Sequence, residues 1–289
     1  MAPGETPSPS VKTEPPLPGE PAPEHPEAHG FGASKRGRKV EFWVVLGLVL
    51  ALPLLGIWGA RLLAARLAMS LPPSVDVQLG RPSWEAFAAS PERCKSAAAE
   101  RYVAAIAAPL LSALGETPFK FHFLVLDASE VNAFALPGGY VVVNRGLLDS
   151  ALQGDEVAGV LAHELSHVLE RHSTKRLVGS LGAGVALNII FGVVDLGAPA
   201  LTVAALSSLG YDRDQEREAD EKGREILIRA GISPAGMATF FERLSGSVSL
   251  PEFISTHPDP GNRAEAARQA AAGHESRFTL PAPPKVECD

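Results

Sequence analysis

The chain has 289 residues, of which 46% are hydrophobic, and a formal net charge of −7. This length allows one good-sized domain core, with segments left over for appendages. The negative charge and the lack of a basic block in the folded part argue against nucleic acid as a partner, so that class of function is set aside. Cys94 and Cys288 lie too far apart to indicate a disulfide framework or a thiolate metal cluster, and a single disulfide between them stays open.

Two N-terminal segments differ sharply in composition. Residues 1–34 are rich in Pro, Glu, Gly and Ser and predict a disordered tail, because they cannot bury enough apolar surface to offset chain ordering; a polyproline-type docking segment is the alternative. Residues 42–60 carry no charge and are long enough to cross about 30 Å of hydrocarbon, which predicts a transmembrane helix over residues 40–62 in contact with membrane lipid. A cleaved signal peptide fits less well, because the apolar run is too long.

Basic residues flank this predicted span unequally. Four of them lie between Ser34 and the span, whereas Arg61 and Arg66 follow it. By the positive-inside rule, the N-terminus is cytoplasmic and everything after residue 61 lies outside the cytoplasm. The sequence therefore predicts a single-pass membrane protein.

Helix and strand signals alternate after the span. An alanine-rich stretch predicts a helix over about residues 90–114, and alternation predicts a strand over residues 119–126. A hairpin or bent strand pair is predicted next, in NAFALPGGYVVVNRGLL, where a Pro-Gly-Gly turn signal precedes a β-branched run at residues 140–143. His122 is interpreted as a satisfied surface or core residue rather than a metal ligand.

Three histidines and two glutamates lie within the stretch LAHELSHVLERHS. Apolar residues recur at i, i+4, i+8 and i+11 through residues 155–171, which predicts an amphipathic helix. His163 and His167 lie off the apolar stripe and one turn apart, so that both imidazoles can bind one metal ion beside Glu164; this His-Glu-x-x-His pattern is the zinc-hydrolase signature. His172 is rotated about 140° from His167 on a continuous helix and is expected to be structural or superficial.

A catalytic zinc site needs three protein ligands and one open position. A second helix is predicted in YDRDQEREADEKGREILIRAG, where Glu216 and Asp220 are four residues apart and share a face. Glu216 is interpreted as the third ligand, and Asp220 as the acceptor for the distal nitrogen of a ligating imidazole. Arg217, Glu218 and Glu221 are interpreted as a charged, solvated face.

The sequence resembles the membrane-linked gluzincins of peptidase family M48. The matching pieces are, in order, NAFALPGGYVVVNRGLL, HELSHVLERHS, RDQEREAD and THPDPGNR, which together cover roughly residues 95–272. The resemblance implies an α+β fold: a mostly helical, zincin-like metalloprotease domain with a small β-sheet at residues 80–273, preceded by one transmembrane helix. One departure is Asp212, where a serine commonly stands in the family.

The resemblance also implies roles for individual residues. His163, His167 and Glu216 would bind one zinc ion per subunit, Glu164 would be the general base, and Asp220 would hold His163.

Further roles concern the substrate. The backbone of Asn132, Ala133 and Phe134 would hold an extended peptide by strand addition. His257 and Arg263 would contact substrate, or His257 would block the open metal position in a resting state. The donor to the oxyanion stays open among His257, Arg263 and Tyr211.

The segment between the predicted ligand helices is strongly apolar. An apolar helical hairpin is predicted over residues 177–210, interrupted by Asp195. It either dips into the bilayer or folds against the domain or another subunit, and its short arms favour the second. Residues 274–289 are interpreted as a loose C-terminal tail.

Together these features predict a zinc-dependent endopeptidase in the cell inner membrane, with a cytoplasmic N-terminus and a periplasmic catalytic domain. Its expected partners are misfolded or stress-damaged envelope proteins, since strand addition depends on backbone more than on side chains. The alternative is a zinc-stabilised chaperone or assembly factor that binds extended chains without cleaving them. Glu164 favours catalysis, because a structural zinc site needs no base. The natural substrate and the oligomeric state stay open.

Overall fold

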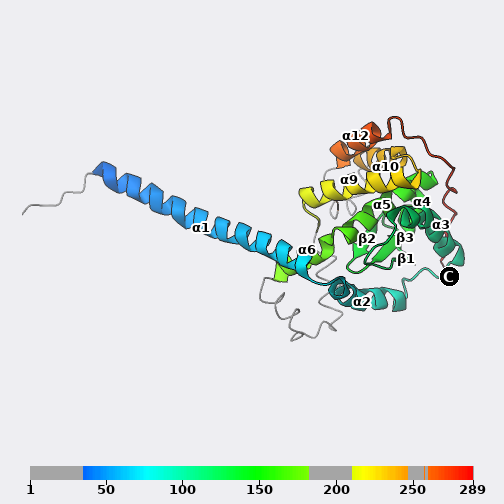
Figure 1. Cartoon of the computed structure of the whole chain (residues 1–289), viewed down its shortest axis with the longest axis horizontal. Coiled ribbons are helices and arrows are strands. Elements are labelled where there is room, and N and C mark those ends of the chain that lie inside the picture. Colours follow the sequence, from blue (N-terminus) through cyan, green and yellow to red (C-terminus); the bar gives the residue numbers. More distant parts are fainter. Residues whose placement is uncertain (1–34, 182–209, 247–256, 258–259, 289) are drawn as a thin grey trace, which may run out of the picture. The chain divides into compact units, whose positions relative to one another are not determined.

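The structure is a computed structural model that describes residues 35–181, 210–246, 257 and 260–288, drawn in Figure 1. The chain divides into two compact units, Met1–Pro53 and Leu54–Asp289. The helices in the described residues are α1 (Lys35–Ser70), α2 (Pro73–Ala89), α3 (Ala97–Leu114), α4 (Arg145–Ser150), α5 (Gly154–Leu169), α6 (His172–Leu181), α9 (Arg213–Ala230), α10 (Ala235–Gly246) and α12 (Pro260–Ala271).

Two of these helices are long and apolar enough to cross a membrane, judged by length and composition. The first is the stretch Glu41–Gly59 of α1, which is not buried in the protein and which Pro53 does not interrupt. The second is α3, but its inner face packs in the main core through residues such as Val103 and Ile106. We therefore regard α3 as a core helix, and α1 as the candidate span.

A three-stranded sheet lies at the centre of the second unit, in the order β1-β3-β2. β1 (His122–Leu126) runs parallel to β3 (Tyr140–Asn144), and β2 (Ala133–Leu136) runs antiparallel to β3. The predicted hairpin is confirmed. Its turn requires Gly138 and Gly139, whose φ angles of 86° and 101° are rare for residues with a side chain.

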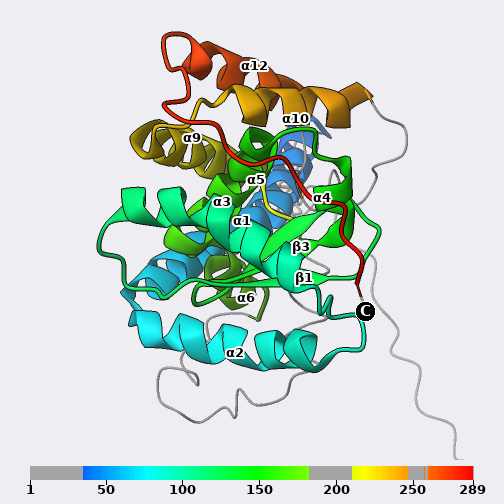
Figure 2. The same ribbon diagram turned by 90° about the vertical axis from the view of Figure 1, so that its right-hand side faces the viewer.

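The two faces of the sheet pack against different helices, because side chains alternate along each strand. One face joins the main core with α3, α5 and α10. The other face packs against Trp84 and Phe87 of α2. Figures 1 and 2 show the resulting order of layers: α10 and α12, then α9 and α5, then the sheet, then α2.

The helix α2 is not among the elements predicted from the sequence. Pro73 stands at its first position, where the missing N–H has no partner within a helix, and Pro82 lies inside it. Gly80 lets α2 approach the β2–β3 turn, since a Cβ at this position would overlap the carbonyl oxygen of Pro137. Tertiary packing against the sheet therefore outweighs the local proline signals.

The helix α5 is buried on every side. All residues from Glu156 to Val168 are buried, and α5 packs against α9, α10 and the sheet. The amphipathic helix predicted here therefore has no solvated face, and its polar side chains point into the protein interior.

The helix α9 is fixed at both ends and lies close to α5. The Asp212 side chain accepts hydrogen bonds from the backbone N–H groups of Asp214 and Gln215 at 3.0 and 2.9 Å, and Gln215 completes a capping box. Gly231 ends the helix in the left-handed conformation. At Gly223 an added Cβ would lie 3.3 Å from backbone atoms of α5, so the two helices nearly touch.

The C-terminal segment is ordered, contrary to the loose tail expected from the sequence. Residues 274–288 contain no helix or strand, but Leu280 and Val286 are buried in the main core. Cys288 forms a disulfide with Cys94, which settles the pairing that the sequence leaves open. Buried apolar side chains and a covalent bond thus hold the segment along the domain.

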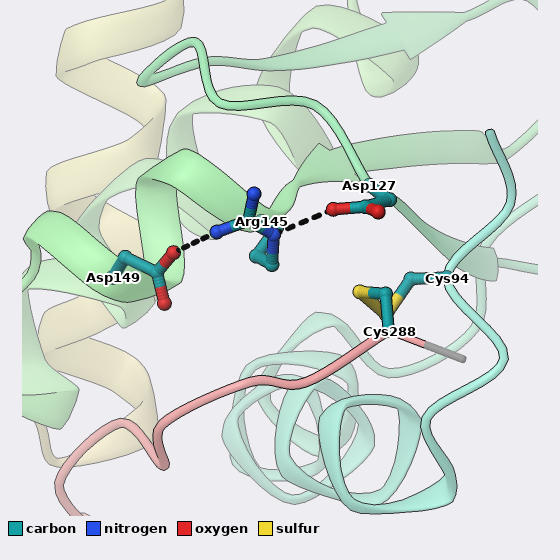
Figure 3. Close-up of a disulfide and its surroundings, with 5 residues drawn as sticks. All are labelled: Cys94, Asp127, Arg145, Asp149 and Cys288. Carbon is teal, nitrogen blue, oxygen red and sulfur yellow. Dashed lines mark hydrogen bonds and ion pairs between the residues drawn. A yellow bond between two sulfur atoms is a disulfide. The ribbon is translucent and has the colours of Figure 1, made fainter.

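Figure 3 shows this disulfide beside a small ion-pair cluster at the start of α4. Arg145 donates from Nε to Asp127 at 2.6 Å and from Nη1 to Asp149 at 2.5 Å. The cluster joins the end of β1 to α4.

The predicted tail at residues 1–34 and most of the predicted apolar hairpin lie outside the described residues; α6 covers only the start of the hairpin.

Candidate metal centre

Two helices bring three potential metal ligands together inside the domain. His163 and His167 come from α5, and Glu216 comes from the first turn of α9. The two histidine Nε2 atoms are 2.9 Å apart, and Glu216 lies 3.3 Å from His167 Nε2 and 3.6 Å from His163 Nε2. The structure thus gathers the three residues that the sequence predicts as ligands.

A fourth potential ligand, His257, joins this cluster from a distant part of the chain. Its Nδ1 lies 3.0 Å from Glu216 Oε1 and 3.2 Å from His163 Nε2. Ligand atoms of His163, His167, Glu216 and His257 all lie within 4.8 Å of one another. His257 Nε2 also lies 3.6 Å from a carboxylate oxygen of Glu164.

Glu164 lies next to the cluster, and its carboxylate lacks hydrogen bonds to the described residues. It is fully buried, and within the described part of the chain neither of its oxygens has a hydrogen-bond partner. Burial raises the pKa of Glu164, and the nearby His257 and His163 oppose that rise. Because buried carboxylate oxygens without hydrogen bonds are costly, this arrangement fits a site completed by a cation and a water molecule.

The protonation states of His167 and Glu216 also fit a divalent cation. Burial holds the pKa of His167 well below its ordinary value, aided by the neighbouring His163, so its imidazole is neutral as metal binding requires. Burial opposes ionisation of Glu216, but His257 and His163 outweigh it and lower the pKa of this carboxyl strongly. A neutral imidazole and an ionised carboxylate are both ligand types that zinc commonly takes.

The distal nitrogen of His163 contacts a buried ion pair. Asp220 Oδ1 lies 2.9 Å from His163 Nδ1, and Arg263 binds Asp220 through two hydrogen bonds of 2.7 and 2.8 Å. Arg263 Nη1 also lies 2.8 Å from Glu216. Burial alone would raise the pKa of Asp220, but Arg263 and His163 lower it, so the carboxylate is ionised. Arg263 therefore faces two carboxylates of the site, and its predicted contact with substrate stays a prediction.

The site also includes His172 and Glu218, which the sequence does not predict as part of it. His172 Nδ1 lies 2.8 Å from His167 Nδ1, and His172 Nε2 lies 3.0 Å from Glu218. The predicted rotation of His172 away from His167 is wrong because α5 ends at Leu169. Arg171 then adopts a positive φ of 56°, and α6 begins at His172. No local pattern in the sequence signals a positive φ at an arginine.

Tyr211 contacts the site through its ring and not through its hydroxyl. The ring stacks on His167 with centroids 3.7 Å apart and planes at 15°. Its hydroxyl lies 2.9 Å from Ser173 Oγ and donates to the Ala135 carbonyl at 3.4 Å. This hydroxyl is therefore directed toward β2, which removes Tyr211 from the candidate donors to an oxyanion.

The edge strand β2 presents only part of its backbone outward. Asn144 N–H donates to the Asn132 carbonyl at 3.0 Å, so the alternation of an antiparallel ladder turns Asn132 and Phe134 toward β3 and Ala133 toward the free edge. Ala133 is fully buried in this structure. Of the three residues whose backbone is predicted to hold the substrate, Ala133 alone directs its backbone groups outward.

Two histidines one turn apart on a buried helix, a glutamate beside them and a second glutamate from another helix form the arrangement that is typical of gluzincin metallopeptidases. The sequence model described as "Peptidase family M48" matches residues 97–271. The chain therefore belongs to peptidase family M48.

Several characterised proteins share this region. The chain is 31% identical over 188 residues to the "Beta-barrel assembly-enhancing protease" of Escherichia coli (strain K12), a match that covers 59% of this chain and 38% of that protein. It is 32% identical over 155 residues to the "Mitochondrial metalloendopeptidase OMA1" of Arabidopsis thaliana, covering 53% and 32%. It is 34% identical over 161 residues to the "Metalloprotease LoiP" of Escherichia coli (strain K12), covering 51% and 61%. The chain thus spans well under half of the first two relatives.

Proposed function

We propose that this chain is a membrane-anchored zinc endopeptidase that cleaves misfolded or stress-damaged proteins of the cell envelope. The observation that carries the proposal is the buried convergence of His163, His167 and Glu216. Beside them lies the carboxylate of Glu164, which accepts no hydrogen bond from the described residues. A structural metal site has no use for an additional buried carboxylate that, among the described residues, accepts no hydrogen bond. The arrangement therefore supports hydrolysis over a chaperone that only binds.

His163, His167 and Glu216 would hold the zinc ion, which when bound supplies Lewis acidity that lowers the pKa of water to about 7 and polarises a peptide carbonyl. Glu164 accepts the proton of the attacking water and passes it to the leaving amine. Asp220, held by Arg263, keeps the proton of His163 on Nδ1, so that Nε2 is available to the cation.

The proposed substrate is an extended or unfolded polypeptide. Such a chain would add as a strand beside β2, with Ala133 supplying the outward N–H and C=O groups. His163, Glu164, His167, Glu216 and His257 are each at most 2% exposed, so substrate would reach them only after part of the domain moves. We interpret this arrangement as a resting form in which His257 occupies the position of a fourth ligand.

The proposed location is the cell inner membrane, with the N-terminus in the cytoplasm and the catalytic domain in the periplasm. Two observations support it: the excess of basic residues before the apolar part of α1, and the Cys94–Cys288 disulfide, which is typical of oxidising compartments. The Escherichia coli relative is named for beta-barrel assembly, which agrees with substrates in the envelope.

The test is the substitution Glu164→Gln in the full chain purified in detergent. We expect zinc content to stay at the wild-type level while the rate of cleavage of a chemically unfolded reporter protein falls by about 10²- to 10⁴-fold. His163→Ala should lose both zinc and cleavage, whereas Glu221→Gln, an exposed glutamate on α9, should change neither. Wild-type cleavage by Glu164→Gln would refute the proposed base. Binding of the reporter by zinc-loaded wild-type chain without cleavage would favour the chaperone alternative.

A further inference from the structure

We propose that His172 and Glu218 are positioning residues for the ligand His167, forming a hydrogen-bonded relay that fixes the tautomer and the orientation of its imidazole. The inference rests on the proposed function, in which His167 binds the metal ion. It gives a role to two residues that lie outside the His-Glu-x-x-His motif and its glutamate partner.

The direction of each hydrogen bond in the relay follows from the cluster geometry. His167 Nε2 faces His163 Nε2 at 2.9 Å and Glu216 at 3.3 Å, so this nitrogen must keep its lone pair for a cation. The ring proton of His167 therefore resides on Nδ1 and is donated to His172 Nδ1 at 2.8 Å. His172 in turn carries its proton on Nε2 and donates it to Glu218 Oε2 at 3.0 Å.

The backbone is arranged to bring His172 to this position. On a continuous helix, residue 172 would point away from residue 167. The break between α5 and α6 reverses this, at the cost of a positive φ at Arg171, a conformation that residues with a side chain rarely adopt. Arg171 is held there by hydrogen bonds to Asp76 at 3.1 and 2.5 Å and to the Leu71 carbonyl at 2.7 Å.

The surroundings of His167 leave its ring little freedom. His172 is fully buried, and the Tyr211 ring stacks on the face of His167. The relay resembles the contacts of the other ligand histidine. The distal nitrogen of His163 contacts Asp220, and Asp220 binds Arg263. In the same way, the distal nitrogen of His167 contacts His172, and His172 binds Glu218. Each ligating imidazole therefore has a partner on its distal nitrogen and a charged group behind that partner, the arrangement by which proteins orient metal-bound histidines.

The experiment measures Co²⁺ binding to the full apo chain by competition with a chelating indicator, together with the visible absorption of the Co²⁺-loaded form. His172→Leu fills the space without an acceptor, and we expect a 10- to 100-fold loss of Co²⁺ affinity and a changed absorption spectrum. His172→Asn places an amide oxygen near the position of Nδ1 and should restore affinity to within a few-fold, with a spectrum like the wild type. Glu218→Ala should lie between the two, and Glu221→Ala should match the wild type.

Folding is checked by circular dichroism of each apo variant. If His172 had a structural role alone, His172→Asn would lose as much Co²⁺ affinity as His172→Leu. Wild-type affinity and an unchanged spectrum in both His172→Leu and Glu218→Ala would overturn the relay. Should His172→Leu fail to fold, the other two variants still test the proposal. A lower Co²⁺ affinity in His172→Asn, or an unchanged Co²⁺ affinity in Glu218→Ala, would contradict it. Absence of Co²⁺ and Zn²⁺ binding by the wild-type chain would instead refute the proposed function.

Discussion

Arg171 is a single residue on which the local geometry of the site depends. Its guanidinium forms a buried ion pair with Asp76, which also accepts a hydrogen bond from Thr174. Asp76 is 1% exposed and Arg171 is 7% exposed. The pair joins α2 to the break between α5 and α6. It therefore connects the start of the domain to His172, which contacts His167.

Removal of this guanidinium is expected to destabilise the whole domain. Arg171→Met leaves Asp76 as a buried charge without its cation, which should lower the free energy of unfolding by about 3–5 kcal/mol. Urea denaturation followed by circular dichroism measures the change. The exposed pair of Arg93 and Glu100 is the control, since Arg93→Met should cost about 1 kcal/mol at most. Equal losses in the two variants would contradict the importance given to burial.

Among the elements, α9 shows how a helix terminus can support a metal ligand. Glu216 lies in its first turn, where fraying would move the carboxylate away from the histidines. The capping box of Asp212 and Gln215 prevents that fraying. The resemblance to the family leads us to expect serine at residue 212, and aspartate can replace it because both residues cap helices about equally well.

Substitution of the cap tests this explanation. Asp212→Ala is expected to lower the free energy of unfolding by about 1 kcal/mol and to weaken metal binding, because the first turn of α9 loses its hydrogen-bond acceptor. Asp212→Ser should retain both properties. Urea denaturation and Co²⁺ titration give the two readouts, and a serine variant as weak as the alanine variant would show that the side-chain cap is not the cause.

At the scale of the whole molecule, the C-terminal segment is bonded to Cys94, in the segment between α2 and α3, by a disulfide between residues 194 positions apart. Such a long loop constrains the unfolded chain strongly. Leu280 and Val286 add apolar contacts with the main core along the way. The segment therefore contributes to the stability of the domain that holds the metal centre.

Loss of the disulfide is expected to cost about 2–5 kcal/mol of unfolding free energy. Cys288→Ser, Cys94→Ser and the double variant should lose the same amount, since each removes the same bond. Treatment of the wild type with a reductant should reproduce the loss, and the variants should no longer respond to it. A stability unaffected by reductant, together with unstable serine variants, would assign the effect to packing of the cysteine side chains.

The local pattern of the sequence accounts for much of the fold and of the candidate site. The hairpin follows from a Pro-Gly-Gly turn between apolar stretches, and the paired positions of His163 with His167 and of Glu216 with Asp220 follow from helical spacing. These features depend on residues within a turn or two of one another. Periodicity is sufficient for them.

Tertiary structure decided the features of the fold and of the site that local patterns do not predict. The sequence predicts an amphipathic α5, a loose C-terminus and a His172 that points away from His167. In the structure α5 is enclosed on all sides, the C-terminal segment packs on the core, and His172 contacts His167. In each case the cause is a contact between residues far apart in the chain: the helices and sheet that enclose α5, the disulfide at Cys288, and Asp76, which holds Arg171 in a backbone conformation that its own residue type disfavours. Local periodicity carries no information about such contacts, because they form only when distant segments pack together.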